Sequence, residues 1–150
     1  MSNIFECLLV PVNGSKASVA AVNLAIQLAK EHSARLVLIH VVDTTVRDQL
    51  ARRSGRARDV VQRELEESGK RCLNYAAQLA ERAGTDFDKV LRVGLTDAEI
   101  INEAEAREVS LIVIGRPVYR WPQGEFFGRV ARHIIESAQC PVLVARTKAD

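Results

Sequence analysis

Polar residues and glycines that could bind a ligand follow the apolar runs of this sequence. Asn13-Gly14-Ser15 comes directly after the first run, and Gly94 and Gly115 follow two later ones. Asparagine and serine side chains both donate and accept hydrogen bonds, and glycine lets a backbone approach a ligand closely. Each glycine has an equally supported structural interpretation, because a tight turn also favours glycine.

Residues for catalysis or metal binding are sparse. Each histidine stands on a separate predicted element, without a matched nucleophile or carboxylate. The cysteines form no CxxC or Cys/His ligand spacing, and their odd number argues against a disulfide framework, so we expect small buried hydrophobes. The residues concerned are His32, His40, His133, Cys7, Cys72 and Cys140.

Well-known nucleotide and hydrolase motifs are absent. The sequence has no GxxxxGK[ST], no GxGxxG after its first apolar run and no GxSxG, so it matches neither a P-loop, a dinucleotide fingerprint nor a nucleophile elbow. A response-regulator receiver would need carboxylates where Asn13 stands. Because no convincing general base is evident either, we expect no enzyme; weak nucleotide hydrolysis or self-phosphorylation stays open as an alternative.

Composition indicates one ordinary globular domain. The chain has 150 residues, 47% of them hydrophobic and 27% charged, with a net charge of +2. That balance does not predict binding to nucleic acid, and the apolar stretches are too short to span a membrane. The first residues lack the basic region of a secretory leader. We expect a cytoplasmic protein.

Apolar runs alternate with longer segments of helical spacing. Near-continuous runs are typical of strands covered on both faces. The runs predict strands at residues 7–12, 36–41, 90–93, 110–114 and 141–145. The helical spacing predicts helices from Ser15 to about His32 and over residues 59–83, 96–108 and 127–138.

The helix ends carry recognisable signals. Ser15 is a suitable N-cap residue, and Gly84 stands where a left-handed C-cap belongs. Thr96-Asp97-Ala98-Glu99 has the spacing of a capping box.

This alternation predicts an open α/β fold with a parallel sheet and helices on both faces. Ligands bind such sheets beyond the carboxyl ends of the strands. Four segments should converge there: residues 11–15, 41–43, 93–94 and 115 onward.

An arginine-rich stretch connects the second strand to the next helix. Residues 47–58 hold five arginines and one acidic residue, Asp48. We expect residues 43–58 to form an irregular, solvated and mobile connection, because they offer few apolar anchors. The alternative is a surface that gathers phosphates or an acidic partner.

Several segments together resemble the universal stress protein family. The match is carried by Leu8–Ser15, by His40-Val41-Val42, by Leu111–Gly115 with Gly128, and by Ala138–Arg146. The resemblance covers residues 1–150 as one such domain. It implies a Rossmann-like sheet of five strands in the order 3-2-1-4-5, of the adenine nucleotide alpha hydrolase-like type. It also implies a small cytoplasmic regulatory or sensor protein of the stress response, commonly a homodimer.

Nucleotide-binding members of that family carry G-x2-G-x9-G-[S/T] after the fourth strand. Here Gly115 and Gly128 keep the outer spacing, whereas Val118 and Arg129 replace the middle glycine and the hydroxyl residue, and Asn13 replaces an aspartate. No cofactor is required, but the altered motif implies ATP, ADP or AMP, with Mg²⁺, as candidate ligands. The implied ligand contacts are Pro11, Val12, Asn13, Ser15, Val41, Ile114, Gly115, Val118, Gly128, Arg129 and Val130.

Arg129 has two opposite interpretations. With Arg116 and Arg120 it could clamp a phosphate or carboxylate, or its side chain could fill the phosphate site. A cation at the start of a helix opposes the helix dipole unless an anion is bound beside it.

Two further surfaces point to partners. Residues 116–127 concentrate aromatic side chains, which pack under the loop or present a patch to a protein partner. The alternative function is therefore an interaction module without nucleotide binding. In the implied strand order the fifth strand is an apolar edge, and the resemblance implies that two copies pair there. That homodimer contact comprises Val142, Leu143, Val144 and Ala145.

Overall fold

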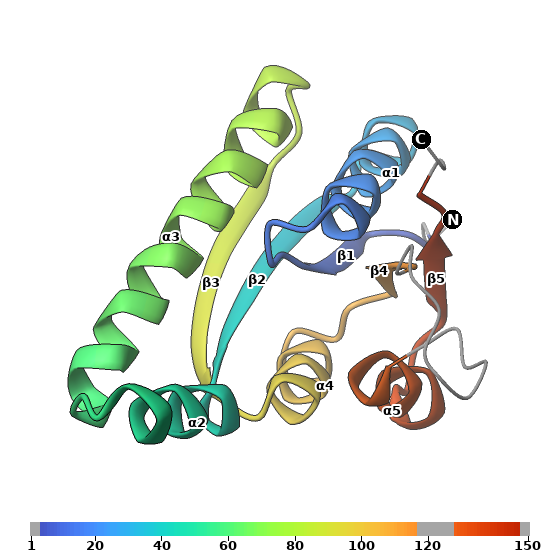
Figure 1. The fold of residues 1–150 in the computed structure, drawn as a ribbon. Helices are drawn as coiled ribbons and strands as arrows, with labels where there is room; N and C mark the ends of the chain where they lie inside the picture. The colour runs from blue at the N-terminus through green and yellow to red at the C-terminus, as the bar shows by residue number, and fades with distance from the viewer. Residues whose placement is uncertain (1–3, 117–127, 148–150) are drawn as a thin grey trace.

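A computed structural model describes residues 4–116 and 128–147 of the chain (Figure 1). Strands and helices alternate through most of it. In chain order the elements are β1 (Cys7–Pro11), α1 (Lys16–His32), β2 (Arg35–Asp43), α2 (Thr44–Ser54), α3 (Arg58–Arg82), β3 (Phe87–Gly94), α4 (Thr96–Ala106), β4 (Leu111–Gly115), α5 (Arg129–Ser137) and β5 (Val142–Ala145).

The strands form one parallel sheet in the order β3-β2-β1-β4-β5. This confirms the predicted fold class and strand order. The strand order reverses between β1 and β4, and the helices that follow these two strands, α1 and α5, cover opposite faces of the sheet. Such a switch point opens a crevice at the carboxyl ends of the strands.

Helices cover both faces of the sheet. Alternate strand residues such as Leu8 and Val10 pack under α1 and α3, while Leu9 and its neighbours pack under α4 and α5, against Ile100 and Ile134. Figure 1 shows α4 and α5 lying together and α3 running along β3 and β2. Burial on both faces explains why the strands are continuous apolar runs rather than alternating ones.

Two predicted helix ends are confirmed. Ser15 is the N-cap of α1, and its Oγ accepts the Ser18 N–H at 3.1 Å. After α3 the chain turns at Gly84, whose φ is +76°, and the Thr85 N–H donates to the Ala80 carbonyl at 3.1 Å. This is a Schellman-type ending, which requires a residue without a Cβ penalty at the turn.

The prediction of an irregular connection over residues 43–58 is wrong for most of its length, because Thr44–Ser54 form α2. The Asp43 carboxylate caps the helix by accepting from the Thr45 N–H at 2.8 Å. The helix ends at Gly55, with φ +70°. Only Ala51 of α2 is buried, so the sequence of this helix shows little apolar periodicity. Capping and packing against α3 stabilise the helix instead.

The predicted capping box at Thr96 is also wrong. Leu95 occupies the N-cap position of α4 without a side-chain hydrogen bond, and Thr96 is already the first helical residue. The Thr96 hydroxyl donates instead to the Asp43 carboxylate at 2.7 Å. A carboxylate acceptor 53 residues away in the sequence competes successfully for that hydroxyl.

The cysteines are free, as expected, but all three are partly exposed rather than buried. Burial still raises the pKa of the Cys7 and Cys140 thiols. Among the described residues, no helix is both long and apolar enough to cross a membrane.

The fold predicts that one glycine-to-alanine substitution in a helix, at Gly69, destabilises the protein instead of stabilising it. Gly-to-Ala changes inside exposed helices usually stabilise by up to about 1 kcal/mol, but a Cβ at Gly69 would overlap the His40 ring, with Nε2 only 2.8 Å away. We expect Gly69→Ala to lower the free energy of unfolding by about 1–3 kcal/mol, measured by urea denaturation.

The exposed neighbour Ser68 supplies the control: Ser68→Ala should change stability by less than about 0.5 kcal/mol. In a His40→Ala background the cost of Gly69→Ala should largely vanish, because the overlapping ring is gone. A stabilising Gly69→Ala would contradict the packing described.

Candidate functional site

A crevice of about 630 Å³ opens at the carboxyl ends of β1, β2 and β4. The first turns of α1 and α5 and the start of α4 complete its walls. Its volume lies within the range of small-molecule sites in proteins. Much of the lining is apolar, including Ile39, Val41, Ile100 and Ile114.

Ten of the predicted ligand contacts lie together on this crevice. They are Pro11, Val12, Asn13, Ser15, Val41, Ile114, Gly115, Gly128, Arg129 and Val130. Val118 lies outside the described residues, as do Arg120 and the aromatic residues of the 116–127 loop. That the ten contact a ligand stays a prediction.

The turn after β1 is fixed by a compact set of hydrogen bonds. The Asn13 N–H donates to Ser18 Oγ at 3.1 Å, and Asn13 Oδ1 accepts from the Ser15 N–H at 3.0 Å and from Ser15 Oγ at 2.7 Å. Gly14 between them has φ +81°. The turn thereby presents Asn13 and Ser15 to the crevice as part of a rigid entry to α1.

His40 supports the same turn from the α3 side of the sheet. Its Nδ1 lies 2.6 Å from the Val12 carbonyl oxygen, which can only accept, so Nδ1 carries the proton and donates. The Val12 N–H donates to the Ile39 carbonyl at 2.7 Å. Both backbone groups of Val12 are therefore held by β2. His40 thus positions the turn that follows β1.

Gly115 has a structural reason to be glycine. A Cβ there would overlap the backbone carbonyl group of Ala17, and the Ala17 Cβ would lie 2.9 Å away. Together with the left-handed Gly14, this favours the interpretation in which glycine allows a turn and a close approach of β4 to α1. The two interpretations are compatible, because the same close approach shapes the crevice.

Two cations line the crevice at helix N-termini. Arg129 is the first residue of α5, and in the part of the chain that the structure describes its exposed side chain has no hydrogen-bond or ion-pair partner. Lys16, the first residue of α1, also lines the crevice and was missed because nothing in its local sequence distinguishes it. Arg116 lies beside the crevice but does not line it.

The start of α5 adds unsatisfied donors. Gly128 is its N-cap and provides no side-chain hydrogen bond to the first turn. Such a helix end presents free N–H groups and a partial positive charge, which favour an anion. With Arg129 and Lys16 nearby, this end of the crevice is suited to a phosphate or carboxylate.

Asp43 joins the crevice wall to the neighbouring helices. Besides capping α2, its second oxygen accepts from the Thr96 N–H at 3.2 Å and from the Thr96 hydroxyl, and Thr96 lines the crevice. Burial would raise the pKa of Asp43, but the hydrogen bonds from Thr96, Val46 and Thr45 together outweigh it and hold the pKa below its ordinary value.

A histidine–carboxylate pair connects α4 and α5. His133 Nδ1 lies 2.6 Å from Asp97 Oδ2, a pair that the sequence did not indicate because its members are 36 residues apart. Burial opposes ionisation of Asp97, yet the hydrogen bond from His133 keeps the pKa of the carboxyl below its ordinary value. Neither residue lines the crevice, so the pair fixes the two helices that form its wall.

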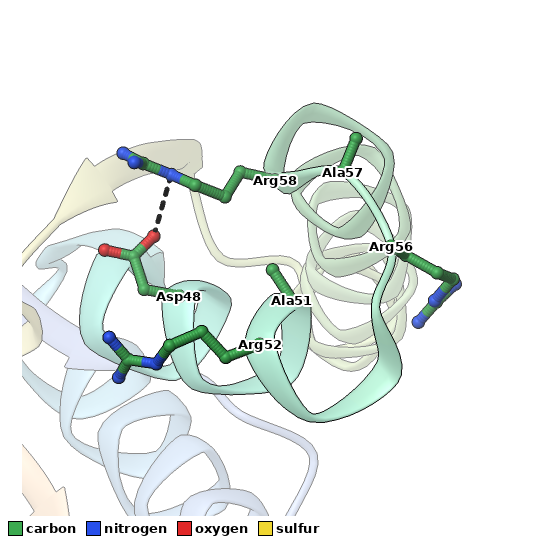
Figure 2. Close-up of a pocket in the computed structure, with 6 residues that line it drawn as sticks. All are labelled: Asp48, Ala51, Arg52, Arg56, Ala57 and Arg58. Atoms are coloured by element: carbon green, nitrogen blue, oxygen red, sulfur yellow. Dashed lines mark ion pairs between the residues drawn. The ribbon is translucent and has the colours of Figure 1, made fainter.

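A second cavity, of about 440 Å³, lies between α2 and the start of α3 (Figure 2). Arg52 and Arg58 extend to the same side as Asp48, whereas Arg56 points away from them. Asp48 Oδ1 accepts from Arg47 at 2.9 Å and lies 3.2 Å from Arg58 Nε. The acidic side chain thus ties α2 to α3 and offsets much of the local positive charge.

The described residues contain no group of three or more His, Cys, Asp or Glu side chains placed to hold a metal ion. The features of the chain that suit a ligand are therefore an apolar wall, hydrogen-bond donors and cations at one crevice. Together with the sheet order, they define a Rossmann-like α/β protein with a crevice at its topological switch point, where ligands bind in folds of this class.

Comparison with known proteins gives the family. The sequence profile of the universal stress protein family matches residues 5–146. The chain is 30% identical to universal stress protein MJ0531 of Methanocaldococcus jannaschii over 144 residues, which are 96% of this chain and 84% of that protein. The chain belongs to the universal stress protein family, as the sequence motifs predicted.

Solved structures agree with the fold. Hypothetical protein MJ0577 superposes with a TM-score of 0.82 at 20% identity, over 98% of this chain and 99% of that one. Other neighbours are an Archaeoglobus fulgidus universal stress protein in complex with dAMP (TM-score 0.70, 22% identity, 94% and 98% covered) and a universal stress protein in complex with cAMP (0.70, 21%, 96% and 98%). An Arabidopsis thaliana family member has AMP bound (0.68, 16%, 97% and 94%).

The Asp43 contacts predict a pH-dependent contribution to stability. Because the folded-state pKa is lowered, the carboxylate stabilises the fold above its ordinary pKa of 3.8 and loses that effect as pH falls below it. Asp43→Asn keeps an acceptor for α2 but loses the carboxylate that Thr96 needs. We expect a cost of about 1–3 kcal/mol at pH 7, shrinking between pH 5 and 3, measured by urea denaturation.

The exposed Asp59 provides a matched control, since Asp59→Asn removes the same charge at a residue whose ion pair, to the exposed Arg63 at 3.5 Å, is long. Its cost should stay below about 0.5 kcal/mol. If Asp43→Asn has the same cost at every pH, the carboxylate does not hold α2 and α4 in its charged form.

Proposed function

We propose that this chain binds an adenine nucleotide, ATP, ADP or AMP, in the crevice and acts as a regulatory or sensor protein of the stress response in the cytoplasm. The observation that carries the proposal is the pairing of an apolar wall with two cations at helix N-termini in one crevice. A base fits the wall of Ile39, Val41 and Ile100, and a phosphate fits the start of α5 beside Arg129.

The comparisons support the same ligand class. Three structural neighbours from the family hold dAMP, cAMP and AMP, so the fold accommodates an adenine nucleotide in other chains. Arg129 supports it in this chain, because a cation at the first turn of a helix is unfavourable without an anion beside it. The arginine then takes the place of the usual hydroxyl as a phosphate ligand.

The proposed role is regulatory rather than enzymatic. Within the described residues no carboxylate lines the crevice as a general base, and the imidazole of His40 donates from Nδ1 to Val12 while its Nε2 faces Gly69 of α3. Any Mg²⁺ would arrive with the phosphates of ATP or ADP, which are its usual ligands in such sites.

We further propose that two copies of the chain associate through β5. This strand is at the end of the sheet, and among the described residues it pairs with β4 alone. Leu143 is 36% exposed, and an apolar edge of this kind favours pairing with a second chain. Such a contact leaves the crevice open.

The Arg129→Ser variant distinguishes an arginine that binds the phosphate from one whose side chain fills the phosphate site. We expect nucleotide affinity to fall at least about tenfold, because a charge-assisted hydrogen bond is lost. The unliganded variant should be equally stable or more stable by about 0.3–1 kcal/mol, because a cation leaves the helix N-terminus. Calorimetric titration with AMP and ATP, with and without Mg²⁺, measures the first effect, and thermal unfolding the second.

Arg53→Ser on α2 is the control, since it removes an exposed arginine that does not line the crevice; the nucleotide affinity of this variant should match that of the parent chain. Tighter binding by Arg129→Ser would mean that the arginine fills the phosphate site. Absence of binding by the parent chain at millimolar nucleotide would contradict the proposed function.

The β5 contact predicts a change in oligomeric state. Leu143→Glu should convert the dimer to monomer in sedimentation velocity, because the two-fold axis places two new carboxylates at a desolvated contact. Leu50→Glu on α2, at a residue that is 40% exposed, should leave the dimer intact. A monomeric parent chain, or a dimer that survives Leu143→Glu, would exclude association through β5.

A further inference from the structure

Helix α5 forms the cationic end of the crevice, yet few contacts hold it in place. Gly128 and Arg129 at its start line the crevice, and Gly128 provides no side-chain cap. Ile134 is the one buried residue of the helix, while Val130 and Ile135 are 38% and 42% exposed. Most of the stability of a short helix comes from its packing against other elements. A helix with one buried residue therefore depends on its polar contacts for an exact position.

Helix α4, which lies beside α5 (Figure 1), is anchored along its length. Its first residue, Thr96, donates to the Asp43 carboxylate at 2.7 Å. Further along, Glu103 accepts from Arg92 Nε at 3.0 Å. The buried residues of the helix are Ile100, Glu103 and Ala104. The position of α4 is thus fixed by contacts in which α5 takes no part.

The hydrogen bond between Asp97 and His133 joins the anchored helix to the weakly held one. His133 Nδ1 lies 2.6 Å from Asp97 Oδ2, and Asp97 Oδ1 accepts the Ala98 N–H at 3.0 Å. The second contact fixes the orientation of the carboxylate at the start of α4. An ionised carboxylate can only accept, so Nδ1 carries the proton and donates.

This bond lies close to the part of α5 that faces the crevice. Arg129 is one helical turn before His133, and Ala131 between them lines the crevice. Holding His133 against α4 therefore also sets where the first turn of α5 stands relative to the rest of the lining.

We propose that Asp97 and His133 are positioning residues, whose hydrogen bond holds the first turn of α5, with Arg129, where it binds the phosphate of a ligand. This inference rests on the proposed function, because it assumes an anion at the start of α5. Donors that are loosely held meet an anion less well, which lowers affinity. A pair as exposed as this one adds little to overall stability, so its effect should fall on α5 and on the ligand.

The proposal predicts an effect of the opposite sign from that of charge alone. Asp97 follows Thr96 of the crevice lining, and a carboxylate near an anion repels it. On electrostatic grounds its removal strengthens the binding of a phosphate. If Asp97 acts by holding α5, its removal weakens that binding.

Two substitutions of Asp97 separate the hydrogen bond from the charge. Asp97→Ala removes both, and we expect the affinity for AMP to fall about three- to tenfold, measured by calorimetric titration at fixed pH and ionic strength. Asp97→Asn removes the same charge, but its amide oxygen can still accept from His133 Nδ1. Its affinity should therefore stay within about twofold of the parent chain.

Glu136→Ala is the matched control. Glu136 is an exposed residue of α5, one turn after His133, and in the described part of the chain it has no hydrogen bond or ion pair. The substitution removes a carboxylate from the same helix without breaking its link to α4. We expect the affinity of this variant for AMP to equal or exceed that of the parent chain.

Hydrogen exchange of the backbone amides tests the positioning without any ligand. In Asp97→Ala the amides of residues 132–138 should exchange about threefold faster or more, whereas those of α1 should be unchanged. Asp97→Asn should exchange like the parent chain.

The outcomes distinguish the two proposals. If the parent chain binds AMP but Asp97→Ala binds it equally well or more tightly, or if α5 exchanges at the parent rate in that variant, the positioning role is wrong and nucleotide binding stands. An equal loss of affinity in Asp97→Asn and Asp97→Ala would also contradict the role of the hydrogen bond. If the parent chain does not bind AMP, the proposed function fails, and the role of the pair in ligand binding fails with it.

Discussion

The backbone of Val12 is the point on which the rest of the site depends. Its N–H donates to the Ile39 carbonyl at 2.7 Å and its carbonyl accepts from His40 Nδ1 at 2.6 Å, so β2 holds both groups just beyond the last residue of β1. That attachment directs the chain into the Asn13–Ser15 turn and sets where α1 begins. Gly69 makes it possible, because any side chain there would displace the His40 ring.

The crevice combines structural and functional demands that oppose each other. Arg129 and Lys16 stand at helix N-termini, where a cation is unfavourable by about 0.3–1 kcal/mol at an exposed site. The same positions are the most favourable ones for binding an anion. Under the proposed function, a chain that keeps both cations gives up some stability in its unliganded state and recovers it when a phosphate binds. Stability and affinity should therefore respond in opposite directions to changes at these residues.

Much of the fold could be predicted from the sequence because its physical causes are local. Each buried strand is a continuous apolar run, and Ser15 and Gly84 mark helix ends through their own conformational preferences. The ten crevice residues came together because the strand order fixes which loops meet at one edge. The family resemblance, carried by the motifs around Gly115 and Gly128, supplied that order.

The parts that could not be predicted depend on contacts distant in the sequence. Helix α2 has one buried residue, and its start is fixed by Asp43, which also takes the Thr96 hydroxyl from its expected capping role. The Asp97–His133 pair and the place of Lys16 on the crevice follow from how helices pack, which no local pattern encodes. Asn13 is a similar case: its residue type was evident, but the direction of its amide depends on hydrogen bonds seen only in three dimensions.

The most direct test of nucleotide binding in the crevice is a titration of ¹⁵N-labelled protein with AMP, followed by backbone amide shifts. We expect the large changes at residues 12–18, 40–41, 115–116 and 128–131, which surround the crevice. The second cavity, at Asp48 to Arg58, should show little change. Shifts confined to that arginine-rich cavity, or no shifts at millimolar AMP, would contradict an adenine nucleotide site at the switch point of the sheet.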